Sequence, residues 1–212
     1  MKGIYPALLA TILAMPAMAG DYQIKTVKIR SIESYAARIA IGTITIAADP
    51  YPTDEKSFTA FDVRDLNSKG YFPVHLIIQN SSTSFVSVRT RDIMLLTGGG
   101  QKLYTTSATI VVQDVIKGGL ISKLPKMKSH DQSTSTKTGS PLLDFTSKEL
   151  TNRQIEPGAV SDGFLFFYTD EPKKPLFAGA KLLIPQVTEE GTRKTLGPFE
   201  ISFDASQGAP AK

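Results

Sequence analysis

The run Gly163-Phe164-Leu165-Phe166-Phe167-Tyr168 decides the fold. In an extended chain alternate side chains point to opposite faces, so Phe164, Phe166 and Tyr168 share one face, and Leu165 and Phe167 share the other. A strand that is apolar on both faces is expected at the centre of a sheet, with a second sheet on one side and helices on the other. The pattern therefore predicts a buried central strand with Phe166 in the core.

The same two-residue period recurs on both sides of this run. Phe72, Val74, Leu76 and Ile78 share one face of an expected strand, and His75 on the opposite face is expected to be half-exposed. Further strands are predicted at residues 24–32, 39–46 with a bulge at Gly42, 85–89, 93–96, 180–187 and 196–203. Hairpin loops are expected at residues 98–100 and 190–191. Seven or eight short strands separated by turn residues indicate a mainly β chain, an antiparallel β-sandwich.

Two helices interrupt this pattern. Ala108, Val111, Val112, Val115 and Ile116 follow helical spacing, with Thr106 or Ser107 as the N-cap. A second helix is predicted to begin at Ser140-Pro141, because serine is a favoured N-cap and proline fits the first helical position. A shorter helical turn is expected over residues 54–61. We therefore expect one domain over residues 20–205, with a short helical insertion at about 105–150 and a tail at 206–212.

The first 19 residues have the features of a secretory signal peptide. Lys2 supplies the positive charge, residues 7–15 form a short apolar run, and Ala17-Met18-Ala19 supplies the small-x-small cleavage pattern. The apolar run is shorter than the roughly 20 residues that a spanning helix needs. The sequence therefore predicts cleavage before Gly20, a periplasmic or secreted protein, and no membrane span after removal of the signal.

Positive charge is concentrated in one segment. The chain has 24 Lys and Arg against 20 Asp and Glu, a net charge of +4, and residues 117–139 hold five Lys and one Asp. This segment has no interleaved aromatic residues, so it does not indicate nucleic-acid binding. Lys123, Lys126 and Lys128 are the candidate partner-binding residues, which we expect to contact an acidic envelope protein. The alternative is that the segment is only a solvated spacer.

Two stretches resemble known proteins. Residues 60–64 and 70–82, which end in Asn80-Ser81-Ser82, resemble exported bacterial proteins of immunoglobulin-like, telokin-like fold. Residues 145–150, the turn Pro157-Gly158 and the strand from Gly163 resemble a pattern in uncharacterised envelope proteins and lipoproteins. The resemblance implies an immunoglobulin-like β-sandwich and supplies no catalytic residue. This chain has no Cys, which bacterial lipoproteins need for lipid attachment.

Motifs for chemistry are absent from the sequence. Without Cys there is no disulfide, no thiolate metal site and no Cys nucleophile, and no Walker A, Rossmann, HExxH or EF-hand pattern occurs. We expect no cofactor and no metal, although the acids at residues 49–65 leave a calcium site open. The sequence favours a non-enzymatic envelope protein, a protein-binding or structural module. The alternative is an envelope-acting hydrolase or a carbohydrate-binding protein. The residues of its site would be distant in the sequence and brought together only by folding.

Overall fold

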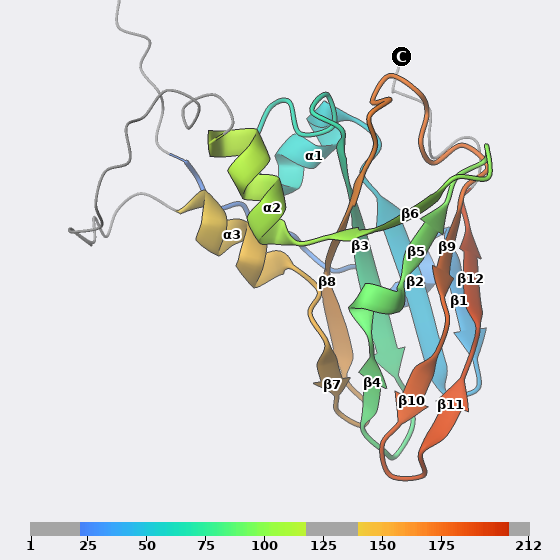
Figure 1. Ribbon diagram of the computed structural model, residues 1–212. Coiled ribbons are helices and arrows are strands. Elements are labelled where there is room, and N and C mark those ends of the chain that lie inside the picture. Colours follow the sequence, from blue (N-terminus) through green and yellow to red (C-terminus); the bar gives the residue numbers. More distant parts are fainter. Residues whose placement is uncertain (1–21, 118–139, 204–212) are drawn as a thin grey trace, which may run out of the picture.

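A computed structural model of the chain describes residues 22–117 and 140–203. Within these residues the protein is mainly β, with antiparallel strand pairing and few helices (Figure 1). The strands are β1 (Arg38–Ile41), β2 (Ile44–Pro50), β3 (Tyr71–Asn80), β4 (Val86–Val88), β5 (Met94–Leu96), β6 (Lys102–Thr106), β7 (Arg153–Ile155), β8 (Val160–Tyr168), β9 (Lys181–Ile184), β10 (Val187–Glu189), β11 (Lys194–Leu196) and β12 (Phe199–Ser202). The helices are α1 (Asp54–Ala60), α2 (Ala108–Val112) and α3 (Pro141–Lys148), with 3₁₀ turns η1 (Ile32–Ser34) and η2 (Thr90–Asp92) and a π-helical turn η3 (Gln113–Lys117).

The strands form a large sheet and a small one. The large sheet has eight strands in the order β1-β2-β3-β8-β6-β5-β9-β12, and the small sheet has four in the order β11-β10-β4-β7. The large sheet curls until its two end strands, β1 and β12, lie in contact (Figure 1). This curvature gives it a nearly barrel-like shape, unlike the flatter layers of a two-sheet sandwich.

The predicted central strand is confirmed. β8 lies between β3 and β6 in the large sheet, and Phe166 is fully buried. Leu165 and Phe167 belong to the main core, which fills the space between the large and small sheets. Phe164 and Phe166 belong to a second core, on the outer face of the sheet beneath the helices. Both faces of β8 are therefore covered, as its apolar sequence predicted.

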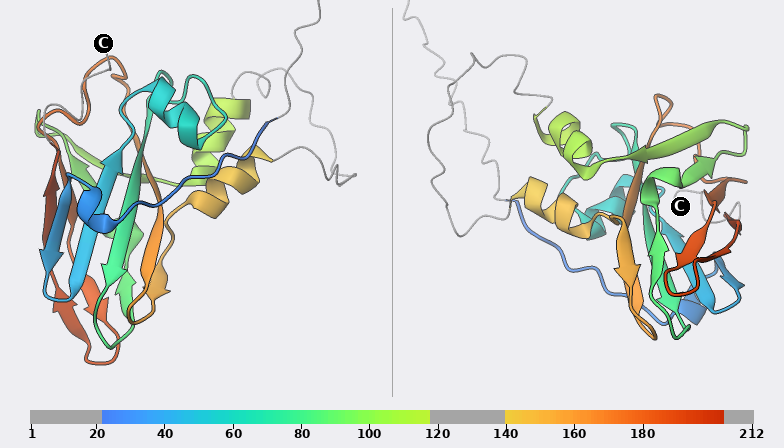
Figure 2. Two further views of the ribbon diagram at one scale, coloured as in Figure 1. Left: turned by 180° about the vertical axis from the view of Figure 1, so that it is seen from behind. Right: turned by 60° about the horizontal axis from the view of Figure 1, so that its bottom comes forward.

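The helices pack on that outer face (Figure 2). Ala108, Val111, Val112 and Val115 are all buried there, as their spacing predicted. The Ser140 hydroxyl caps α3 and accepts a hydrogen bond from the Leu143 N–H at 3.5 Å. The turn expected over residues 54–61 is the two-turn helix α1, capped by Thr53. No helix in the described residues is long and apolar enough to cross a membrane.

Gly163 permits a close contact within the outer layer. The chain leaving α3 makes a parallel β-bridge to β8 here, between Glu149 and Phe164. A Cβ on Gly163 would lie 2.7 Å from the Leu150 Cα. A side chain at this position would collide with backbone that cannot move aside. A glycine is therefore needed here, three residues after β8 begins at Val160.

Two local predictions were wrong at the N-terminal end. Residues 24–32 form no strand; they run as an irregular segment across the outer face of the sheet (Figure 2). A segment that crosses strands cannot form a ladder with them, and its backbone N–H groups at Gln23 and Arg30 bond to side chains. Gly42 is not a bulge: with a positive φ of 61° it forms the tight turn between β1 and β2, where Ile41 pairs with Ile44.

The sequence pattern also missed strands. Nothing in it predicted β6 or β7, since β6 is polar at most positions and β7 has three residues. The run 180–187 divides, so that β9 joins the large sheet and β10 joins the small one. The hairpin at residues 190–191 is confirmed between β10 and β11, and the one at residues 98–100 between β5 and β6.

Candidate functional site

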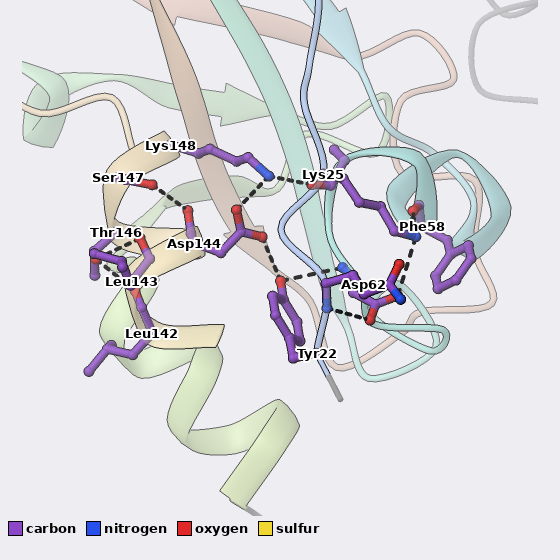
Figure 3. A network of polar contacts seen from close by, with 12 residues as sticks. Tyr22, Lys25, Phe58, Asp62, Leu142, Leu143, Asp144, Thr146, Ser147 and Lys148 are labelled. Atoms are coloured by element: carbon purple, nitrogen blue, oxygen red, sulfur yellow. Dashed lines mark hydrogen bonds and ion pairs between the residues drawn. The ribbon is translucent and has the colours of Figure 1, made fainter. Parts of the chain in front are cut away.

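A polar network centres on Asp144 of α3 (Figure 3). This side chain is fully buried. Its Oδ2 accepts a hydrogen bond from the Tyr22 hydroxyl at 2.6 Å, and its Oδ1 contacts the Lys148 ammonium at 2.6 Å. Lys148 also donates to the Ala60 carbonyl at 2.7 Å. A buried carboxylate is very costly without such partners, so this network holds α3 in one position.

Tyr22 connects the N-terminal segment to this network. Its hydroxyl oxygen also accepts from the Asp62 N–H at 3.3 Å. Burial raises the pKa of the Tyr22 phenol far above its ordinary value, and the hydrogen bond to Asp144 and the charge of Asp144 raise it further. The phenol therefore remains a proton donor at neutral pH, which suits it to bind a carboxylate.

A second ionic contact fastens the same segment a few residues later. Lys25 forms an ion pair with Asp62 at 3.4 Å, and its ammonium lies 3.0 Å from the centre of the Phe58 ring. The Lys25 ammonium also donates to the Phe58 carbonyl. The whole arrangement joins the N-terminal segment, α1 with its following turn, and α3. It can hold three segments together, although the buried Asp144 Oδ1 has only the ion pair with Lys148 and no hydrogen bond.

His75 was expected to be half-exposed, and this was wrong: it is 1% exposed. Its Nε2 lies 2.6 Å from Asp162 Oδ2, and its ring stacks on Phe164 with the ring centres 4.6 Å apart. The face of β3 that carries His75 is covered by the second core and the N-terminal segment, which the strand's own pattern could not show. The pair places an imidazole beside a carboxylate.

The acids at residues 49–65 are spread over separate partners. Asp49 pairs with Lys56 at 2.6 Å, Asp65 pairs with Lys69 at 3.1 Å, and Asp62 pairs with Lys25. Asp54 accepts from the Asn67 N–H at 2.6 Å. Within the described residues no three His, Asp or Glu side chains are grouped so that they could hold a metal ion. The calcium site left open by the sequence therefore has no support here.

Two neighbouring hollows form the concave candidate site, at the end of the molecule where the loops after β2, β5 and β8 meet. The first is about 480 Å³ and the second about 390 Å³, and both are open to solvent. Lys174 and Pro175 line both of them. We call this surface the loop-end groove; its walls include Pro52, Pro172 and Pro175, with the charged residues Asp54, Glu55, Lys173 and Lys174.

The charged groups of the loop-end groove are not arranged for acid–base chemistry. Asp54 and Glu55 are consecutive residues at the start of α1, and neighbouring positions on a helix do not face each other. Hydrogen bonds from its own backbone and from Thr53 lower the pKa of Glu55. A general acid would instead need a raised pKa. The groove is better suited to contact with a polar surface.

The predicted partner-binding residues Lys123, Lys126 and Lys128 lie outside the described residues. The structure places only the ends of their segment, at Lys117 after α2 and at Ser140 before α3. Sequence reasoning also passed over Tyr22 and Asp144, which form the network of Figure 3. The i,i+4 spacing of Asp144 and Lys148 is a signal that could have indicated their ion pair.

Comparisons with known proteins give only remote likenesses. No protein-family profile matches the chain, and no curated protein is similar to it. Among solved structures, the yjhA protein of Bacillus subtilis is 7% identical with a TM-score of 0.37, covering 71% of this chain and 78% of that one. A functionally unknown protein of Listeria monocytogenes is 12% identical with a TM-score of 0.37, covering 79% and 80%.

A candidate lipoprotein of Bacillus subtilis, ycdA, is 14% identical with a TM-score of 0.38. The match covers 79% of this chain but only 38% of that one. At these scores and identities the likenesses assign no activity or partner. The chain is thus similar, at a distance, to bacterial proteins of which one is a candidate lipoprotein and one is of unknown function.

Proposed function

We propose that this is an exported, non-enzymatic envelope protein, periplasmic or secreted, that serves as a protein-binding or structural module. The loop-end groove is the observation that carries the proposal. Its two hollows share Lys174 and Pro175, so together they form one continuous surface. The groove is walled by prolines, and its charged side chains do not meet at one point. Such a surface suits an extended segment of another protein better than a reacting small molecule.

Several buried polar side chains interact with other groups of the protein, and this supports the non-enzymatic part of the proposal. Asp144 is hydrogen-bonded to Tyr22 and ion-paired with Lys148, and His75 is hydrogen-bonded to Asp162. Asn67, which borders the groove, donates to the Tyr51 carbonyl at 2.8 Å and accepts from the Ser57 hydroxyl. A catalytic group would have to be directed at a substrate rather than satisfied within the fold.

The immunoglobulin-like class is also part of this proposal. Two antiparallel sheets around a shared core support it. Its location in the envelope is supported by the N-terminal signal pattern, with Lys2, the apolar run and the Ala17-Met18-Ala19 site. N-terminal sequencing of the exported protein should give Gly20 as the first residue. A retained Met1 would contradict export.

Charge reversal in the groove provides the test of partner binding. We expect the double variant Lys173→Glu/Lys174→Glu to lose its partner in a pull-down from envelope extract. Lys194→Glu is the matched control, since it reverses an exposed lysine on β11, outside the groove. The triple variant Lys123→Ser/Lys126→Ser/Lys128→Ser tests the basic segment. Unchanged capture by the groove variant, with the fold intact, would contradict a role for the groove.

A further inference from the structure

We propose that the outer face of the large sheet carries a second peptide-binding site, whose displaceable occupant is the chain's own N-terminal segment, residues 22–31. The left-hand view of Figure 2 shows this segment running across that face. Its Tyr22 and Val27 side chains pack against the second core. The partner that fits the site is an extended segment of another protein, with a tyrosine and, three residues later, a lysine. The site is separate from the loop-end groove.

The N-terminal segment is attached like a bound peptide and not like a strand. Among the described residues, no backbone–backbone hydrogen bond joins residues 22–30 to the rest of the chain. Ile24 and Ile29 are 52% and 43% exposed, so part of its apolar surface faces solvent. Segments with few buried contacts open at a lower free energy than global unfolding. The main core includes none of residues 22–31, so both sheets can stay folded while the segment leaves.

The face recognises a tyrosine through a buried carboxylate. Asp144 is fully buried, and its Oδ2 accepts the hydrogen bond from the Tyr22 hydroxyl at 2.6 Å, while its Oδ1 pairs with Lys148 (Figure 3). A buried carboxylate that loses one partner is strongly destabilised. A phenylalanine in place of the tyrosine would fill the same space without the donor, so the face should discriminate between the two.

The face recognises a lysine through a second set of acceptors. Asp62 pairs with the Lys25 ammonium at 3.4 Å and also accepts from the Gln23 N–H at 2.9 Å. The Phe58 carbonyl accepts from the same ammonium, which lies 3.0 Å from the centre of the Phe58 ring. Residues 22–31 contain three basic residues and no acidic one. The charge of the segment thus complements the carboxylates that hold it.

The attached segment competes with any incoming peptide. A short flexible connection gives a tethered ligand an effective concentration of about a millimolar. The apparent affinity for an external peptide falls in proportion to the fraction of molecules in which the face is open. Weakening the attached segment should therefore strengthen the binding of an external one. A segment that only stabilises the fold would not give this opposite response.

Peptide binding tests the inference. The probe is a fluorescent peptide of residues 22–31, added to the purified chain without its first 19 residues and followed by fluorescence anisotropy. Tyr22→Phe in the chain should raise the apparent affinity about tenfold, because it removes a hydrogen bond to a charged group. The same change in the peptide should weaken binding about tenfold. The matched control Tyr104→Phe removes the hydroxyl of a tyrosine that is 58% exposed on β6, and should leave the affinity unchanged.

Three results would overturn the inference. They are no peptide binding to the Tyr22→Phe chain, equal affinity of the wild-type and Tyr22→Phe chains, and equal binding of the peptides with tyrosine and with phenylalanine. Thermal unfolding followed by circular dichroism verifies that each variant is folded, and Lys25→Met in the chain is a second way to weaken the attached segment.

The loop-end groove provides a separate control. The variant Lys173→Glu/Lys174→Glu should bind the peptide as the wild-type chain does, because both lysines line the groove and neither contacts the N-terminal segment. Loss of peptide binding in this variant would place the peptide in the groove and contradict a site on the outer face. The pull-down that tests the groove and the peptide assay can therefore fail separately.

Discussion

The buried ion pair between Asp144 and Lys148 gives the sharpest stability prediction. Replacing Lys148 with Met leaves a carboxylate that is fully buried, with the Tyr22 hydroxyl as its remaining donor. Removing one partner of a buried pair costs about 3–5 kcal/mol. The Lys148 side chain is 15% exposed and the Tyr22 bond is retained, so we expect a loss of about 2–4 kcal/mol.

Urea unfolding followed by far-UV circular dichroism measures this loss. Lys174→Met is the matched control, because Lys174 and Glu171 have the same 2.6 Å separation but are 71% and 53% exposed. It should cost less than about 0.5 kcal/mol. Adding Asp144→Asn to Lys148→Met should recover about 1–2 kcal/mol, since the unpaired charge is then gone. Equal losses in Lys148→Met and Lys174→Met would refute the reasoning.

Three further predictions concern the core, the outer layer and pH. Phe166→Ala should cost about 3–5 kcal/mol in the same urea assay, and a loss under about 1 kcal/mol would contradict its burial. Gly163→Ala should cost about 1–3 kcal/mol because its Cβ would meet the Leu150 backbone, so full stability would argue against that contact. Burial raises the pKa of Tyr22 and Tyr51 above the ordinary value of 10.0, with the charges of nearby Asp144 and Asp49 adding to the shift. The unfolded tyrosines therefore ionise first: the stabilisation is complete below about pH 10 and falls as pH rises further, and Tyr22→Phe should weaken this alkaline loss in a pH series of melting temperatures.

The sequence alone determined the features that depend on local pattern. The alternation from Gly163 to Tyr168 assigned the two faces of β8, because side-chain direction in a strand follows from the backbone. Ser140 and Pro141 located the start of α3 for a similar reason, since capping involves only the first helical turn. The signal pattern of the first 19 residues is equally local and stays a prediction.

Tertiary structure decided which distant residues meet. Tyr22 and Asp144 are 122 positions apart, and no periodicity connects them. His75 is buried because β3 pairs with β8 and the outer face of both strands is covered, which places Asp162 beside the imidazole. A local pattern shows which side chains share a face, but what covers that face depends on packing between segments far apart in the chain.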